Sequence, residues 1–170
     1  MITGERKDSG LPEIIYRFWS NRTFKSGRRW ELTKSLPGDS ISSEEIDAVN
    51  GHLTATYADP LEILSWAAAL NREPKNFPYV NSTKSMIGHC LGAAGSIETI
   101  TSILELQGGF LHPSINCEDI HPKLEPFTDR IIREYMDYPE LGTIAKASFG
   151  FGDVNSCLII KKWENSMMPA

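Results

Sequence analysis

Two short apolar segments of the chain each lead into a histidine just before a helix-like pattern begins. One passes through Asn50 and Gly51 to His52, and the other passes through Asn81 and reaches His89. In open α/β sheets, the turns at the carboxyl ends of the strands hold the binding and catalytic groups. Two histidines in equivalent turns therefore predict convergence on one pocket. There, two neutral imidazoles can hydrogen-bond a single carbonyl oxygen as it gains negative charge.

The order of predicted elements favours an α/β layered fold with a mixed sheet. Strands are expected at residues 46–50, 79–81, 143–149 and 156–162, and helices at residues 60–70 and 92–108. Asp59 is the expected N-cap of the first helix, and Asp59-x-x-Glu62 also fits a capping pattern. Gly108 and Gly109 end the second helix, and a proline-bearing loop follows at 112–126. The last two strands are expected to form an antiparallel hairpin.

Length and composition exclude several classes of protein. A chain of 170 residues predicts one domain, and its net charge of -5 argues against a general nucleic-acid binder. No apolar run approaches membrane-spanning length, and the first residues lack the apolar stretch of a secretory signal, so a cytoplasmic location is expected. The three cysteines are scattered and form neither a disulfide framework nor a CxxC metal site. Adjacent residues such as His89 and Cys90 rarely suit tetrahedral zinc, so no metal is expected.

The two histidine segments carry a specific resemblance. One reads Asn50-x-His52-x-Thr54-x-Thr56, and the other reads Thr83-Lys84-Ser-x-x-Gly88-His89-x-x-Gly92-Ala-Ala-Gly95. They closely resemble two signatures of β-ketoacyl-[acyl-carrier-protein] synthases, the condensing enzymes of fatty acid and polyketide synthesis. The resemblance covers residues 46–163 and corresponds to the carboxy-terminal half of such an enzyme. Residues 1–45 are left as an unassigned leader and residues 164–170 as a tail.

The resemblance implies a thiolase-like α/β half, with a mixed, mostly parallel sheet, flanking helices and a carboxy-terminal β-hairpin. It also implies a decarboxylative Claisen condensation, in which malonyl-carrier extends an acyl thioester by two carbons. His52 and His89 would bind the malonyl thioester carbonyl and stabilise the enolate. Lys84 matches the family lysine, and Glu62 matches the carboxylate that partners it. For Glu62, helix capping is the alternative role.

The same resemblance assigns four substrate-binding residues. Thr54 and Thr56 would hydrogen-bond the phosphopantetheine arm of an acyl carrier protein, and no cofactor of the chain's own is implied. Phe149 and Phe151 match the paired phenylalanines of the Gly-Phe-Gly turn, where Phe151 would gate the acyl pocket and offer its backbone N–H to an oxyanion hole. Plain core packing is the alternative for these two. His112 and His121, each followed by proline, are expected to be structural.

The chain also departs from the family pattern. Leu53 and Asp153 stand where glycines are usual, and Tyr57 stands where proline is usual. More seriously, condensation needs a cysteine to carry the acyl chain. The family places it in a segment resembling Asp-x-Ala-Cys-Ser in the absent half. We assign that role to none of the three cysteines present, which are Cys90, Cys117 and Cys157.

Three hypotheses remain open from the sequence. The chain is part of an active synthase that needs a cysteine-bearing half, or a non-catalytic partner similar to chain-length factors, or an inactive truncated product. A dimer is possible, and fatty acid and polyketide use are not distinguished. In the leader, a short amphipathic helix is expected at residues 11–19, and a helix cap at residues 42–45. A basic cluster at Arg22, Lys25, Arg28 and Arg29 is either a solvated surface or a docking surface for an acidic carrier.

Overall fold

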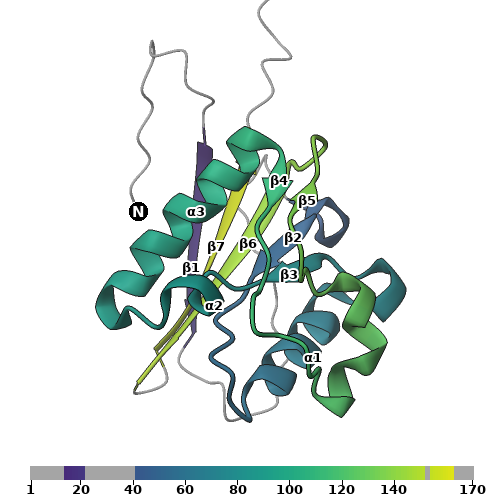
Figure 1. Ribbon diagram of the computed structural model, residues 1–170. Coiled ribbons are helices and arrows are strands. Elements are labelled where there is room, and N and C mark those ends of the chain that lie inside the picture. The colour runs from purple at the N-terminus through teal and green to yellow at the C-terminus, as the bar shows by residue number, and fades with distance from the viewer. Residues whose placement is uncertain (1–13, 22–40, 152–153, 163–170) are drawn as a thin grey trace, which may run out of the picture.

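A five-stranded mixed sheet forms the centre of the structure, a computed structural model that describes residues 14–21, 41–151 and 154–162 (Figure 1). In spatial order its strands are β1 (Ile14–Asn21), β7 (Val154–Lys162), β6 (Thr143–Gly150), β2 (Ala48–Asn50) and β3 (Tyr79–Asn81). β6 pairs in parallel with β2, and β2 pairs in parallel with β3. β6 and β7 form an antiparallel hairpin, and β1 pairs antiparallel with β7. The predicted mixed sheet and hairpin are therefore confirmed. The sheet is not mostly parallel, because its parallel part is the β6–β2–β3 side and the β1–β7 and β7–β6 pairings are antiparallel.

Helices cover the two faces of the sheet. On one face, α1 (Asp59–Leu70) and the 3-10 helix η4 (Pro122–Arg130) pack over Val49 and Ala145. On the other face, α3 (Ala94–Gly108) covers the sheet in Figure 1, and it packs over Ala48 and Ile144. Successive strand residues point to opposite faces, so Ala48 and Val49 belong to different cores. The shorter elements are η1 (Ser43–Glu45), η2 (Pro74–Asn76), α2 (Lys84–Ile87), η3 (Leu91–Ala93), β4 (Phe110–Leu111) and β5 (Met136–Asp137).

The structure corrects several local predictions. The helix expected at residues 11–19 is wrong, because Ile14–Asn21 is a strand at the edge of the sheet. That segment is rich in β-branched and aromatic residues, and pairing with β7 decides its state. The proline-bearing loop contains η4, and α3 begins at Ala94 after the single turn of η3. The helix cap expected at residues 42–45 is confirmed as a capping box before η1.

Three polar pairs join α3 to the sheet, and we call them the polar ladder. Lys146, Asn50 and Asn81 are register partners on β6, β2 and β3, so they point to the same face. Their partners on α3 are Glu98, Ser102 and Glu105, which share one helical face. The contacts are Lys146 Nζ to Glu98 Oε2 at 2.8 Å, Asn50 Nδ2 to Ser102 Oγ at 3.3 Å, and Asn81 Nδ2 to Glu105 Oε1 at 2.7 Å. All six residues are buried.

His112 extends the ladder toward β4. Its backbone N–H donates to Glu105 Oε1 at 3.0 Å, and its Nε2 lies 3.1 Å from Thr83 Oγ1. Thr83 Oγ1 also accepts from Asn50 Nδ2 at 3.0 Å, which closes the network back to β2. His112 is buried here, as expected for a structural histidine, whereas His121 is exposed at the start of η4. Burial raises the pKa of Glu105, which the nearby His112 and Asn81 oppose.

The polar ladder predicts that Asn81→Ala lowers the free energy of unfolding more than a substitution of an exposed asparagine does. The substitution removes the donor to Glu105 and to the carbonyl oxygen of His112, and both acceptors are buried. We expect the free energy of unfolding in urea to fall by about 1–3 kcal/mol, the cost of a buried group left without its partner. Asn76→Ala, at an exposed asparagine in η2, is the matched control and should change it little. Equal losses in the two variants would contradict a special role for the ladder.

Candidate active site

The loops after β2 and β3 are fastened to each other. The N–H of Gly51 donates to the carbonyl oxygen of Asn81 at 2.9 Å. The hydroxyl of Ser82 donates back to the carbonyl oxygens of Gly51 and Leu53, at 3.3 and 3.2 Å. A Cβ at position 51 would lie 2.8 Å from Leu53 Cγ, so the close approach requires glycine there. The two loops therefore form one unit at the carboxyl ends of the parallel strands.

His52 and His89 meet at this unit, and the predicted convergence is confirmed. Their ring centroids are 5.2 Å apart with an angle of 82° between the ring planes. The ring centroid of Phe149, on β6, lies 5.5 Å from that of His52. His89 follows the short helix α2, and Gly88 makes the bend between them at a φ of 76°. His52 is half-buried and His89 is exposed, so the pair is accessible from His89's side.

Hydrogen bonding and charge set the proton positions on the pair. The N–H of Leu91 donates to His89 Nδ1 at 3.1 Å, so in the neutral ring Nε2 carries the proton. The pKa of His52 is lowered to about 4, first because burial disfavours the charged ring and then because Lys84 is a positive neighbour. His52 is therefore an uncharged imidazole at neutral pH. Its one N–H can donate a hydrogen bond without releasing the proton readily.

Lys84 has a different ion-pair partner from the one that the sequence suggested. Its Nζ contacts Glu98 Oε1, and the second oxygen of Glu98 binds Lys146. Two buried ammonium groups therefore share one buried carboxylate. Neither Glu98 nor Lys146 was picked out from the sequence. The signal that points to Glu98 is its place with Ser102 and Glu105 on one face of the helix, at a spacing that apolar residues usually occupy.

Glu62 holds the His52 loop instead of pairing with Lys84. Its two carboxylate oxygens accept the backbone N–H groups of His52 and Leu53 at 2.8 and 3.0 Å. The prediction of a Lys84–Glu62 pair is wrong because Glu62 points from α1 to the loop backbone, whereas α3 presents Glu98 to the lysine. Capping of α1 by Glu62 is not its role either. Burial raises the pKa of Glu62 to about 7, although the two N–H donors favour the charged form.

Asp59 shapes the loop that carries the two threonines. Its carboxylate accepts the N–H groups of Thr54, Ala55 and Thr56, at 3.1, 3.0 and 3.3 Å. Asp59 is thus the first residue of α1 and ties down the preceding turn, while Ala58 holds the N-cap position predicted for Asp59. The hydroxyls of Thr54 and Thr56 lie 3.2 Å apart, Thr54 half-buried and Thr56 exposed. Both can hydrogen-bond a polar chain that enters beside His52.

Phe149 and Phe151 lie in different environments. Phe149 packs partly into the core under α1 and contacts His52, whereas Phe151 lies in the β6–β7 turn with 98% of its side chain exposed. Core packing of Phe151 is therefore wrong, because the hairpin turn projects it away from the sheet. The unusual Asp153 and the basic cluster around Arg28 lie outside the described residues, so their predicted roles stay predictions.

The three cysteines differ in burial, and two thiols are poorly suited to nucleophilic chemistry. Burial raises the pKa of Cys157 to about 12 and also raises that of Cys117. Cys90 directs its thiol to the carbonyl oxygens of Ile87 and Gly88, at 3.9 and 3.8 Å. Thiolate is the reactive form of cysteine, so raised pKa values disfavour attack. Within the described residues, no group of three or more His, Cys, Asp or Glu side chains is placed to hold a metal ion.

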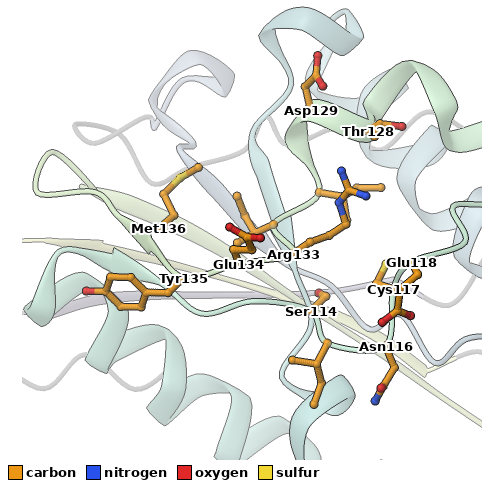
Figure 2. Close-up of a pocket in the computed structure, with 13 residues that line it drawn as sticks. Ser114, Asn116, Cys117, Glu118, Thr128, Asp129, Arg133, Glu134, Tyr135 and Met136 are labelled. Carbon is orange, nitrogen blue, oxygen red and sulfur yellow. The ribbon is translucent and has the colours of Figure 1, made fainter.

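A hollow of about 860 Å³ lies away from the histidine pair (Figure 2). One wall comes from residues 114–118, after β4, and the other from residues 128–129 and 131–136, which run from η4 into β5. Glu118, Arg133 and Glu134 are among its side chains. None of the site residues predicted from the sequence lines it. Among the helices that the structure describes, none has the length and apolar character needed to cross a bilayer.

The raised pKa of Glu62 makes a pH-dependent prediction. The fold favours the protonated acid, so its contribution to stability is full below the unfolded pKa near 4.5 and is lost as pH rises through about 7. Between pH 5 and 7.5, we expect the wild type to lose about 2 kcal/mol of unfolding free energy relative to Glu62→Gln. The amide signals of His52 and Leu53 should move over the same pH range in NMR spectra. A constant difference between the two proteins would contradict the burial effect.

Comparison with known proteins agrees with this geometry. Residues 25–118 match the family described as beta-ketoacyl synthase, C-terminal domain. The chain is 37% identical over 128 residues to 3-oxoacyl-[acyl-carrier-protein] synthase I, chloroplastic, of Hordeum vulgare, covering 75% of this chain and 27% of the relative. It is 35% identical over 166 residues to 3-oxoacyl-[acyl-carrier-protein] synthase 2 of Vibrio harveyi, covering 95% of this chain and 38% of the relative.

A solved structure agrees as well. It is a type II PKS acyl-carrier protein in complex with its ketosynthase bound to the hexaketide, with a TM-score of 0.65 and 28% identity over 73% of this chain and 30% of that one. The likeness confirms the predicted thiolase-like fold. The chain thus spans about a quarter to two fifths of the length of these proteins. It belongs to the β-ketoacyl synthase family and corresponds to the carboxy-terminal domain.

Proposed function

We propose that the chain supplies the malonyl-activating part of a 3-oxoacyl-[acyl-carrier-protein] synthase site. The observation that carries the proposal is the pair of imidazoles with centroids 5.2 Å apart, of which His52 is uncharged at neutral pH. The thioester oxygen of a malonyl group would accept one N–H from each ring. His89 would use Nε2–H, because Leu91 occupies its Nδ1.

In the proposed reaction, the bond between the malonyl methylene carbon and its carboxylate breaks and carbon dioxide leaves. The electron pair moves onto the thioester and gives an enolate, whose oxygen is held by the two N–H donors. The enolate carbon then attacks an acyl thioester and expels its cysteine thiolate. The positive charges of Lys84 and Lys146 favour this negative charge without touching it. The hydroxyls of Thr54 and Thr56 would hold the phosphopantetheine arm of the acyl carrier protein.

The exposed apolar side chains of α3 support a further partner, a cysteine-bearing amino-terminal half. Ile100 and Leu104 are 57% and 53% exposed, on the side of α3 opposite the ladder. Leu91, just before α3, is 72% exposed. Exposed apolar side chains that are grouped on one surface indicate a contact with another protein surface. The relatives contain the additional chain length that such a half requires, and a dimer of the complete enzyme is part of the same proposal.

The histidine pair can be tested by combining the chain with a cysteine-bearing half from a relative. We expect the two combined chains to condense acyl-carrier with malonyl-carrier, and we expect little or no decarboxylation by this chain alone. His52→Ala and His89→Ala should each lower decarboxylation by about 10²–10³-fold, the usual loss for one oxyanion donor. His121→Ala is the matched control, because that histidine is exposed in η4.

Two results would contradict this function. Absence of condensation in the combined wild-type proteins would favour an inactive product. Condensation that survives both histidine substitutions would favour a non-catalytic partner similar to a chain-length factor.

The apolar surface gives a separate prediction. We expect the chain alone to self-associate through it, so Ile100→Ser with Leu104→Ser should lower its sedimentation coefficient and also weaken activity with the cysteine-bearing half. Leu61→Ser with Leu64→Ser, at 46% and 41% exposed positions of α1, is the control pair. Equal effects of the two double variants would contradict a contact on α3.

A further inference from the structure

Lys146 is a buried cation that lies beside the histidine pair but does not belong to either histidine segment. It sits on β6, where register pairing places it next to Asn50, two residues before His52. Its exposed fraction is 3%. Its Nζ binds Glu98 Oε2 at 2.8 Å and also donates to the hydroxyl of Ser148. A charged group this deeply buried must be paired, and Glu98 is the carboxylate that pairs it.

Glu98 already has a partner, so the charges do not balance. Lys84 binds the other oxygen of the same carboxylate, and all three side chains are buried. Among the described residues, the salt bridges of Lys84 and of Lys146 are to Glu98 alone. The cluster therefore holds two ammonium groups and one carboxylate when both lysines are protonated. One unit of positive charge is left over in a region of low dielectric.

The charges of this cluster act on His52. The charged or titratable groups around it come from four elements and one loop: Lys84 on α2, Glu98 on α3, Lys146 on β6, Glu62 on α1 at its backbone N–H, and His89 after α2. Lys84 and Lys146 both oppose protonation of His52, and Glu98 favours it. Lys84 opposes protonation of His52 more strongly than Glu98 favours it, and Lys146 adds to that opposition.

We infer that Lys146 is a positioning residue that shares Glu98 with Lys84 and thereby leaves an uncompensated positive charge in the cluster near His52, which adds to the burial of that imidazole in disfavouring its charged form. The relevance to malonyl activation rests on the proposed function, whereas the effect on His52 does not. Lys146 does not touch the reacting atoms. It acts through the electrostatic potential at His52 and through the orientation of Glu98.

The test follows the His52 ring signal by NMR against pH in the full chain, with no partner or substrate. The midpoint is expected at about 4 in the wild type. Lys146→Met should raise it, because the substitution removes one of the positive charges that oppose protonation of His52. Lys146→Arg keeps the charge and should restore the low midpoint. Lys161→Met, at a half-exposed lysine of β7 that pairs with Glu45, should leave it unchanged.

An unchanged midpoint in Lys146→Met, or a rise in Lys146→Arg equal to that in Lys146→Met, would overturn the inference. If the methionine variant does not fold, Lys146→Gln serves for the same measurement, since it is uncharged but can still donate to Glu98. In the protein combined with a cysteine-bearing half, the acid limb of the activity–pH profile should move upward with the His52 midpoint. If the combined wild-type proteins show no activity while the His52 midpoint still shifts in Lys146→Met, the result counts against the proposed function and not against the role of Lys146.

Discussion

The polar ladder between α3 and the sheet is the constraint on which the rest of the structure depends. Buried charges and amides are costly unless they are paired, so the contacts of Glu98, Ser102 and Glu105 fix both the rotation and the position of α3. With that rotation set, α3 holds Lys84 at the start of α2, and α2 leads directly to His89. A polar contact deep in the sheet therefore positions a side chain at its edge.

The same arrangement explains the electrostatics of the pair. The buried cluster is positive, whereas Glu62 lies on the other side of the His52 loop and holds it through backbone N–H groups. Burial and positive neighbours both disfavour a charged His52. An uncharged ring donates a hydrogen bond without acting as a strong acid, which suits an oxygen that becomes negative only for part of the reaction. Fixed donors need no reorganisation when that charge appears.

Much of this could be predicted from the sequence, because the informative patterns are local. The two histidine segments predicted that His52 and His89 meet, and the turn-forming residues 153–155 between two expected strands predicted the β6–β7 hairpin. The predictions that were wrong concerned packing between segments that are distant in the sequence. The partner of Lys84 is 14 positions away on the next long helix, and Lys146 arrives from a strand 62 positions after Lys84. Polar residues facing inward on α3, with Ile100 and Leu104 outward, invert the usual pattern of a surface helix.

The helix predicted at residues 11–19 was wrong for a related reason, since Ile14–Asn21 is a strand. A short run of β-branched and aromatic residues does not specify helix or strand by itself, and β7 supplies the backbone partners. The sequence of residues 14–21 alone does not predict that pairing with β7. Edge strands of this kind are decided by the sheet that receives them.

The most direct measurement is a crystal structure of the chain combined with a cysteine-bearing half and a non-hydrolysable malonyl thioester analogue. We expect the thioester oxygen to lie about 3 Å from one ring nitrogen of His52 and one of His89, a normal hydrogen-bond distance. The account is contradicted if the analogue's thioester oxygen contacts one ring alone, or if its carboxylate occupies the space between the rings. In either case the two imidazoles would not both hydrogen-bond the carbonyl oxygen.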